Sequence, residues 1–365
     1  MAQVIKKRVV LASVLKTVAD TRMYEKLGLS LARHFSTEVH LIGFPAETPA
    51  VEGIYFHNIY HKPFRRISMR RLLAPAKVLI KLFQLRPRLV IITTHELLVI
   101  GAIYKLLTRT KLYYDVQENY YYNIRFTPAF PKPMRLTLAV YVRAKERLLS
   151  RLINYFFLAE KGYVDELIFA KPFIVLENKL PASFATGENR NNRLHLLFTG
   201  TLAETTGVWQ AIELAEALYR VNNQVRLTVI GHAPSERFLK KLREASLNLP
   251  FVHLTAELFP LPHPEILRAI RQAGTGIIIY PPNPATHSSI PTKLYEYMGM
   301  GLPVLIRHNP LSHDLVMRCR GGIILTEKPD YQALVTEIQQ LQPPVAHPTL
   351  YWESELPKLQ KIFSS

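Results

Sequence analysis

Short apolar runs alternate with amphipathic segments along the whole chain, and this alternation restricts the folds that are open to it. In the first half the runs "RVVLAS", "EVHLIGF", "RLVIITT" and "KLYYDV" are separated by stretches with apolar residues at helical spacing. The second half repeats the scheme with "LHLLFTG", "VRLTVIG", "FVHLT" and "TGIIIY". Strands that alternate with helices form parallel sheets whose two faces are covered by the helices. The pattern therefore predicts an α/β protein with two doubly wound parallel sheets.

The length of the chain points to two domains. A chain of 365 residues exceeds a typical single core. The segment "LENKLPASFATGENRNNR" between the halves is rich in Asn, Gly, Pro and Ser, which is typical of a linker. We expect a first domain over residues 1–180, a linker over 181–193, a second domain over 194–345 and a closing helix over 346–365 that returns to the first domain. The two domains are predicted to face each other across a cleft, with ligands beyond the carboxyl ends of the strands.

Composition narrows the class of protein. Hydrophobic residues at 48% and charged residues at 20% indicate an ordinary globular chain. The single cysteine, Cys319, excludes an intrachain disulfide, fits a reducing compartment and is expected to be a buried thiol. No run reaches the roughly 18 apolar residues of a membrane-spanning helix, and the first residues do not form a signal-peptide pattern. We predict a cytoplasmic protein, peripheral on the inner face of the membrane.

The net charge of +18 is concentrated in the first half. Residues 1–180 hold 29 Lys or Arg against 13 Asp or Glu, a net +16, and the remainder carries +2. Residues 61–88 combine nine basic residues with apolar ones and contain no acid, and residues 120–151 form a second basic and aromatic stretch. An anionic membrane surface, nucleic acid and water are the three surroundings that fit such segments. We favour the membrane, since no nucleic-acid-binding signature accompanies the charge, and we expect Pro75 to break any helix there.

Two segments of the second half carry the chemistry. In "SSIPTKLYEYMGMGLPVL", residues 288–305, two hydroxyls and Lys293 stand within two helical turns of Glu296. Lys293 can neutralise a diphosphate, and Glu296 can accept hydrogen bonds from a ribose diol. The alternative is a helix N-terminus with capping hydroxyls and a surface ion pair. In "FTGTLAETTGVWQAI", Gly200 and Gly207 allow a tight turn into a helix N-terminus that suits a phosphate.

These two segments resemble the donor half of the retaining family 4 glycosyltransferases, enzymes of the two-domain, Rossmann-like GT-B fold. The resemblance continues in "ADTRMYEKLGLSLAR", "YYDVQENY", "FFLAEKGYVDEL" (the last helix of the first domain), "VLENKLP" and the closing "YWESELPKLQKIF", and P-x-K-L-x-E-Y resembles a subgroup of that family. It implies that Glu296 holds the nucleotide ribose. It also implies transfer, with retention, from a nucleoside diphosphate sugar to a saccharide or lipid-linked saccharide acceptor.

The expected donor site contains Gly200, Thr201, Ser288, Ser289, Lys293, Leu294 and Glu296. Lys293 is also expected to take part in catalysis, by stabilising the leaving diphosphate electrostatically. The thirteen histidines lack the spacing of a metal site. We therefore expect no metal and no cofactor beyond the donor substrate.

The first domain supplies the expected acceptor side. His95 ends an apolar run in "ITTHE", and Glu118 follows another in "DVQEN". His95 is predicted to hydrogen-bond the sugar or the acceptor, and Glu118 to orient an acceptor hydroxyl. For each, the alternative is helix capping or a buried hydrogen bond. Asp20, Thr21 and Arg22, after the first predicted strand, are expected on the acceptor side as well.

Departures from the family pattern support other hypotheses. The family commonly has a glutamate eight positions before Glu296, where this chain has Ser288. The usual glycine is replaced by Pro291, which cannot donate an amide hydrogen bond. Thr201 and Thr206 stand where basic residues are often found. A non-catalytic nucleotide-sugar or glycan-binding module is the second hypothesis, an epimerase or hydrolase of the same fold the third, and a nucleic-acid-binding protein the last.

Overall fold

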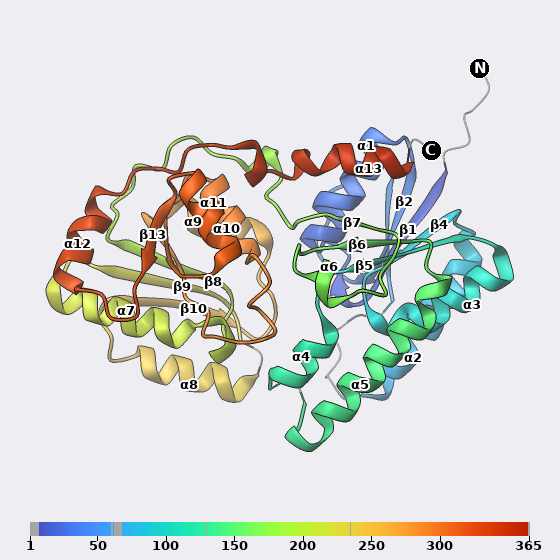
Figure 1. Cartoon of the computed structure of the whole chain (residues 1–365), viewed down its shortest axis with the longest axis horizontal. Helices are drawn as coiled ribbons and strands as arrows, with labels where there is room; N and C mark the ends of the chain where they lie inside the picture. The colour runs from blue at the N-terminus through green and yellow to red at the C-terminus, as the bar shows by residue number, and fades with distance from the viewer. Residues whose placement is uncertain (1–6, 60, 62–67, 129, 234, 364–365) are drawn as a thin grey trace. The chain divides into compact units, whose positions relative to one another are not determined.

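The chain folds into two compact α/β units. The computed structural model describes residues 7–59, 61, 68–128, 130–233 and 235–363. Unit 1 comprises Met1–Asn178 together with Glu355–Ser365, and unit 2 comprises Lys179–Ser354. Figure 1 shows the elements of each unit.

In its described residues, unit 1 holds a parallel sheet of seven strands in the order β3-β2-β1-β4-β5-β6-β7. The strands are β1 (Arg8–Thr17), β2 (Glu38–Phe44), β3 (Ile54–Asn58), β4 (Leu89–Ile92), β5 (Lys111–Val116), β6 (Tyr155–Leu158) and β7 (Phe173–Val175). The helices are α1 (Leu29–His34), α2 (Met69–Leu85), α3 (Leu98–Thr108), α4 (Tyr120–Phe126), α5 (Lys132–Leu149), α6 (Tyr163–Glu166) and α13 (Leu356–Phe363).

The described part of unit 2 holds a parallel sheet of six strands in the order β10-β9-β8-β11-β12-β13. The strands are β8 (His195–Thr201), β9 (Arg226–His232), β10 (Val252–Glu257), β11 (Thr275–Ile278), β12 (Val304–Arg307) and β13 (Gly322–Leu325). The helices are α7 (Val208–Val221), α8 (Glu236–Ser246), α9 (His263–Gln272), α10 (Thr292–Gly299), α11 (Pro310–Arg318) and α12 (Tyr331–Gln340).

Helix α7 illustrates how the sequence pattern produces this packing. Its buried side chains recur at helical spacing, at Val208, Ala211, Ile212, Ala215 and Leu218. They belong to the same core cluster as the buried residues of β8 and β9. Because such a helix must bury its apolar stripe on the sheet, the alternating pattern fixes a layered α/β arrangement. The predicted class, two doubly wound parallel sheets, is confirmed.

The prediction that Pro75 breaks a helix is wrong. Helix α2 runs from Met69 to Leu85 with Pro75 inside it. A proline within a helix removes one backbone hydrogen bond and costs about 3 kcal/mol. Ala74, Val78 and Leu82 are fully buried on the same helix, and their packing offsets that cost.

Two further segments differ from their predicted form. The helix expected in "TRMYEKLGLSLARHF" is a π-helical stretch, Thr21–Gly28, followed by α1. Asp20 caps it, because its side chain accepts hydrogen bonds from the amides of Arg22 and Met23. The segment "FFLAEKGYVDEL" ends strand β6 and retains only the short α6, since its aromatic residues occupy the buried sheet.

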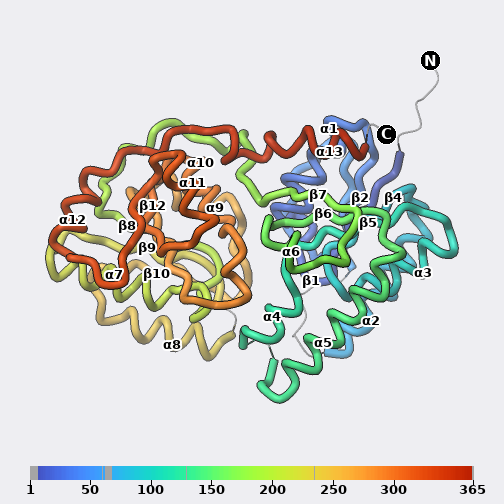
Figure 2. Tube along the Cα trace, viewed as in Figure 1, coloured from blue at the N-terminus to red at the C-terminus, as the bar shows by residue number. Residues whose placement is uncertain are grey.

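The closing helix α13 packs within unit 1. The Lys358 ammonium donates a hydrogen bond of 2.9 Å to the Val175 carbonyl of β7. The Phe363 ring lies 5.3 Å, between centroids, from that of Phe35, directly after α1. The trace in Figure 2 shows α13 beside α1 accordingly.

Candidate functional site

Each sheet has one place where the strand order reverses, between β1 and β4 in unit 1 and between β8 and β11 in unit 2. Loops that leave two such strands diverge to opposite faces, and α/β proteins bind ligands in the resulting crevice at the carboxyl edge. Thr201 ends β8, and Lys293 and Glu296 lie on α10, which follows β11. Asp20 follows β1 and His95 follows β4. These five residues therefore follow or end the strands that flank the reversal point of their own unit.

In unit 2, Gly207 brings the two loops of the reversal point together. It has a φ of +83°, and a Cβ at this position would lie 1.6 Å from the carbonyl oxygen of Ile279, directly after β11. Only glycine fits this backbone geometry and this close approach. Gly207 is also the N-cap of α7, and it has no side chain to occupy the first amides of the helix. Those amides and the positive end of the helix dipole face the carboxyl edge, as an anion site requires.

Thr206 closes the loop between β8 and α7. Its hydroxyl donates to the Thr201 carbonyl at 2.6 Å and accepts from the Ala203 amide at 3.1 Å. Gly200, with a φ of +97°, turns the chain into this loop. Thr201 is exposed at the end of β8. The Thr206 hydroxyl thus shapes the loop, and its hydrogen bonds lie within the loop.

Tyr297 anchors helix α10 on the two central strands. Its hydroxyl accepts a hydrogen bond of 3.0 Å from the Thr199 amide of β8 and lies 2.9 Å from the Thr199 hydroxyl. Its ring lies over Gly276 of β11, where a Cβ would be 2.3 Å from the ring. Burial raises the pKa of Tyr297 well above its usual range, so the phenol stays neutral. Tyr297 therefore ties the C-terminal half of α10 to β8 and β11.

Lys293, in the first turn of α10, is a buried cation. The side chain is 7% exposed. Its ammonium nitrogen lies 3.9 Å from the ring centroid of Phe198 on β8 and 5.3 Å from that of Tyr280, after β11. Among the described residues this nitrogen has no hydrogen-bond partner. The two aromatic rings therefore stabilise the positive charge by cation–π contact, but they do not satisfy the N–H groups of the ammonium as hydrogen-bond acceptors would.

Burial lowers the pKa of Lys293 to about 7, against the opposing effect of Glu296. An ammonium without acceptors is costly inside a protein. A phosphate at this position would supply both acceptors and negative charge. The arrangement can therefore bind an anion at the reversal point of unit 2.

Glu296 lies one helical turn after Lys293 and faces α9. Its carboxylate is 3.3 Å from Nε2 of His263, the first residue of α9, and both side chains are 13% exposed. The His263 ring in turn packs edge-on against Phe184 at 5.5 Å between centroids. The structure therefore places a histidine beside the carboxylate expected to hold a ribose.

The other expected donor residues differ in what they offer. Ser289 is half-buried, and its hydroxyl donates to the Thr286 carbonyl at 3.0 Å, within the loop that leads to α10. Ser288 is half-buried in the same loop. Leu294 is fully buried in the core, and its amide donates to the Pro291 carbonyl at 2.8 Å. This position of Leu294 argues against the predicted donor contact.

In unit 1, the loop after β1 is built around a buried ion pair. The Arg22 guanidinium contacts both carboxylate oxygens of Asp115, at 2.7 to 3.0 Å, and donates to the Leu176 carbonyl at 2.8 Å. Both side chains are buried. Thr21 begins the π-helical stretch and Asp20 caps it. The Arg22 side chain thus holds the loop in place, and the predicted acceptor contact through it loses support.

His95 stands at the carboxyl end of β4 in a defined hydrogen-bonding state. The Lys145 ammonium of α5 lies 3.0 Å from Nδ1 of His95, and the ring of Tyr120 packs edge-on at 4.6 Å between centroids. Burial lowers the pKa of His95 to about 4, so the ring is neutral near pH 7. Because Lys145 can only donate, we assign the ring proton to Nε2.

Glu118 lies beyond the end of β5, the strand that pairs with β4. Its carboxylate accepts a hydrogen bond of 2.7 Å from the Asn123 side chain. Asp20 and, more weakly, Glu118 raise the pKa of Lys16, whose ammonium is 3.7 Å from the Asp20 carboxylate. Asp20 and Lys16 therefore form an ion pair at the carboxyl edge, and the Glu118 carboxylate adds to the negative charge that acts on Lys16.

Sequence reasoning missed Lys16, Lys145 and His263. Lys16 lies in the carboxyl-terminal part of β1, which the predicted strand "RVVLAS" leaves out. Lys145 is far from His95 in sequence, and no spacing signals their contact. His263 follows Pro262 at the start of α9, and a histidine at the first position of a helix after a strand was the available signal.

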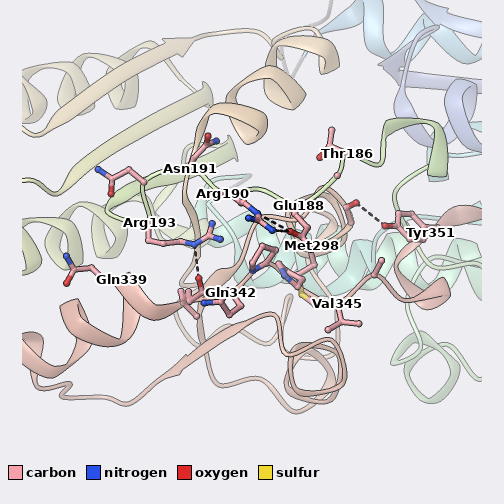
Figure 3. A pocket seen from close by; sticks show the side chains of 18 residues that line it. Thr186, Glu188, Arg190, Asn191, Arg193, Met298, Gln339, Gln342, Val345 and Tyr351 are labelled. Atoms are coloured by element: carbon pink, nitrogen blue, oxygen red, sulfur yellow. Dashed lines mark hydrogen bonds and ion pairs between the residues drawn. The ribbon is translucent and has the colours of Figure 1, made fainter.

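Two cavities of unit 2 lie at opposite edges of its sheet. A cavity of about 210 Å³ lies at the ends of β11 and β12 and is lined by Tyr280, Asn283, Ser289, Pro291 and Arg307 among others. A larger open cavity of about 1050 Å³ (Figure 3) is lined by residues that precede β8 and by the segment after α12. There, Arg193 donates to the Leu341 carbonyl and Tyr351 to the Gly299 carbonyl. Because it lies at the amino edge, away from Lys293, the larger cavity is not the candidate site.

The described part of the chain has no group of three or more His, Cys, Asp or Glu side chains placed to hold a metal ion. Within that part, no helix is both long enough and apolar enough to cross a membrane. Cys319 is buried, as predicted.

Residues 193–342 match the family model "Glycosyl transferases group 1". No curated protein matches the chain in sequence. Sucrose-phosphate synthase from Thermosynechococcus elongatus is similar in structure, with a TM-score of 0.67, 11% identity and 98% of each chain covered.

Two further solved structures resemble the chain. HepE from Anabaena, in complex with UDP and glucose, has a TM-score of 0.64 and 16% identity over 99% of this chain and 100% of that one. The catalytic domain of starch synthase IV from Arabidopsis thaliana, bound to ADP and acarbose, has a TM-score of 0.62 and 12% identity over 98% and 99%. At these identities the likeness shows the fold. The chain has the two-domain GT-B fold, and residues 193–342 within it match the model of the group 1 glycosyl transferases.

Proposed function

We propose that this protein is a glycosyltransferase that moves a sugar from a nucleoside diphosphate sugar to a saccharide acceptor, free or lipid-linked, with retention of configuration. The group 1 glycosyltransferase domain supports the reaction class. HepE binds UDP and glucose and starch synthase IV binds ADP and acarbose, which supports a nucleoside diphosphate donor and a saccharide acceptor.

The observation that carries the proposal is the buried, unsatisfied ammonium of Lys293. It lies between the ends of β8 and β11, where the amides that follow Gly207 begin α7. A cation and a helix N-terminus at one place suit the diphosphate of a nucleotide-sugar. Glu296, three residues on, is then within reach of the ribose that the diphosphate carries.

Catalysis in this proposal is electrostatic. As the bond between the anomeric carbon and the diphosphate loosens, negative charge grows on the leaving phosphate oxygen. The Lys293 ammonium and the first backbone amides of α7, after Gly207, would stabilise that charge electrostatically. Because these groups supply the positive charge, the proposal includes no metal ion.

Unit 1 would supply the acceptor side. Nε2 of His95 carries a proton and can donate a hydrogen bond to a sugar hydroxyl. Glu118 and Asp20 can accept hydrogen bonds from acceptor hydroxyls, and the Lys16 ammonium lies 3.7 Å from the Asp20 carboxylate. These roles rest on the positions of Asp20, His95 and Glu118, which follow the adjacent strands β1, β4 and β5.

The test is thermal stabilisation of the purified protein by a panel of nucleoside diphosphates and nucleotide-sugars, because a ligand that binds only the folded state raises its apparent stability. Lys293→Met serves as the site variant. Lys240→Met is the matched control, since the Lys240 side chain on α8 is 79% exposed. Stabilisation by one nucleotide that is lost only in Lys293→Met supports the donor site. Stabilisation that is equal in both variants contradicts it.

A non-catalytic nucleotide-sugar-binding module is the second candidate. It is favoured by Thr206, whose hydroxyl closes its own loop, and by Ser288 in place of an acidic residue. Mass spectrometry of reactions with the stabilising donor and a panel of saccharides and lipid-linked saccharides separates the candidates. A glycosylated product supports the transferase, donor binding without product supports the module, and sugar release without an acceptor indicates a hydrolase.

A further inference from the structure

Helix α2 exposes a second apolar face. One face of the helix carries Ala74, Val78 and Leu82, which are fully buried on unit 1. The opposite face is solvent-exposed and yet apolar, with the large side chains Met69, Leu72, Leu73, Ile80 and Phe83. These residues recur at helical spacing, so they form one stripe along the helix. A surface helix of an ordinary globular protein is polar on that face.

Helices α3 and α5 show the same feature. The exposed large apolar residues are Val99, Ile103, Leu106 and Leu107 on α3, and Met134, Leu136, Val140, Tyr141 and Leu148 on α5. In the part of the chain that the structure describes, most exposed large apolar side chains lie on α2, α3 and α5. Leu72 is 73% exposed, Leu106 66% and Leu148 76%. Side chains that are exposed to this extent are not part of the hydrophobic core.

The exposed apolar residues of the three helices belong to one continuous surface. Helices α2, α3 and α5 precede β4, β5 and β6, three adjacent strands, and right-handed crossovers place them on the same face of the sheet. Helix α3 contacts both α2 and α5, and the rings of Phe83 and Tyr104 join α2 to α3 at 5.1 Å between centroids. Figure 1 shows the three helices together on one side of unit 1. We refer to the exposed residues of these helices and of their C-terminal ends as the α2–α3–α5 face.

The charged residues of this face have one sign. The exposed ones are Arg70, Lys77, Arg86, Arg109, Lys132, Arg147 and Arg151. Helices α2 and α3 contain no acidic residue, and the single acid of α5, Glu146, is 4% exposed. Arg86 and Arg109 stand at the C-terminal ends of α2 and α3, and Arg151 lies in the short turn that follows α5. A wide apolar surface is therefore bordered by cations alone.

From this combination we infer that the α2–α3–α5 face docks on the surface of an anionic lipid bilayer. The apolar side chains enter the boundary between headgroups and acyl chains, and the Lys and Arg side chains contact lipid phosphates. This inference goes beyond glycosyl transfer and does not depend on it. The segment 62–67, which adds Lys62, Arg65 and Arg66 to the sequence pattern, lies outside the described residues and is not needed for it.

The charges favour a membrane over a second copy of the chain. A two-fold dimer through this face would set the same patch against itself. Its cations would then face one another, and the face offers no exposed acid to pair with them. An anionic bilayer satisfies both the apolar and the cationic side chains. Nucleic acid would satisfy only the cations.

Vesicle co-sedimentation tests the inference without donor or acceptor. The full chain is mixed with vesicles of phosphatidylcholine alone, or of equal parts of phosphatidylcholine and phosphatidylglycerol. We expect sedimentation with the anionic vesicles, weakened by added salt. The apolar variant Leu72→Ser/Leu106→Ser/Leu148→Ser removes one exposed leucine from each helix, and its vesicle affinity should fall at least about tenfold. The charge variant Arg70→Gln/Lys77→Gln/Arg147→Gln should lose at least about tenfold as well.

The matched control is Leu247→Ser/Met317→Ser/Val345→Ser, which removes three exposed apolar residues of unit 2 and should bind vesicles like the unchanged chain. Equal binding by the apolar variant, equal binding to neutral vesicles, or no binding to anionic vesicles overturns the inference. So does a lipid-free dimer, seen by analytical ultracentrifugation, that the apolar variant dissociates. Stabilisation by nucleotides should persist in all three variants, so failure of this inference is distinguishable from failure of the proposed donor site.

Discussion

The ammonium nitrogen of Lys293 lies 3.9 Å from the ring centroid of Phe198, on strand β8, which leads into the loop before α7. The ring faces one side of the cation, and no described residue accepts a hydrogen bond from it. A phosphate would supply the acceptors that this ammonium lacks. The first predictions follow from this pair.

Lys293→Met should abolish tight binding of the donor. Removal of one partner from a buried charge pair typically costs about 2–5 kcal/mol, so the affinity for the best nucleoside diphosphate should fall at least about thirtyfold. Isothermal titration calorimetry measures the change, with Lys240→Met as control. An unchanged dissociation constant in Lys293→Met would remove Lys293 from the site.

The same residue makes stability depend on pH. The folded pKa of Lys293 is about 7, against 10.5 for the free side chain. Below pH 7 both states are protonated and the burial penalty is fully present. Between about 7 and 10.5 the folded state loses the proton first, so the penalty shrinks as pH rises.

The unchanged chain should therefore gain stability relative to Lys293→Met between pH 7 and pH 10, by up to a few kcal/mol at about 1.4 kcal/mol for each pKa unit. Urea unfolding of both proteins across this range measures the difference. A difference in unfolding free energy that stays constant with pH would show that water or buffer ions satisfy the ammonium, so that its pKa is not lowered.

Glu296 should recognise the ribose and not the phosphates. Glu296→Gln keeps the shape of the side chain but weakens two charge-assisted hydrogen bonds, so the affinity for a nucleoside diphosphate should fall roughly tenfold or more. The affinity for inorganic pyrophosphate should stay the same. If both affinities fall equally, Glu296 acts through Lys293, whose pKa it raises, and not on the ribose.

The role of His263 is tested by the same pair of ligands. His263→Ala removes the imidazole that lies 3.3 Å from the Glu296 carboxylate. If His263 only holds Glu296 in place, the variant should weaken nucleoside diphosphate binding less than Glu296→Gln does and leave pyrophosphate binding unchanged. A larger loss than in Glu296→Gln would instead indicate direct contact between His263 and the nucleotide.

The sequence predicted the fold well because the fold rests on local periodicity. The alternation of runs such as "LHLLFTG" with the helical pattern of α7 leaves few arrangements other than parallel α/β layers. The position of Lys293 and Glu296 after β11 was predictable too, since both follow a strand within one short segment. Both predictions depend only on residues that are close together in the sequence.

Contacts between distant segments were not predictable in this way. Arg22 is buried against Asp115, and Lys145 reaches His95 from α5, although no periodicity links these positions. Pro75 shows the opposite failure, because burial of Ala74, Val78 and Leu82 overrides a local rule. Side-chain roles therefore needed the tertiary structure, whereas the position of the loops did not.

Gly207 should tolerate no side chain. A Cβ there would lie 1.6 Å from the Ile279 carbonyl oxygen, and the φ of +83° is already unfavourable for alanine. Gly200 provides the matched control, since its φ is +97° but nothing lies within 4 Å of its Cβ position. Gly200→Ala should cost only the backbone strain, about 1–2 kcal/mol. Gly207→Ala must in addition push apart the loops after β8 and β11, so it should destabilise the protein clearly more and abolish stabilisation by nucleotides. Thermal unfolding with and without nucleotide measures both effects, and equal destabilisation by the two variants would show that the loops are not packed through Gly207.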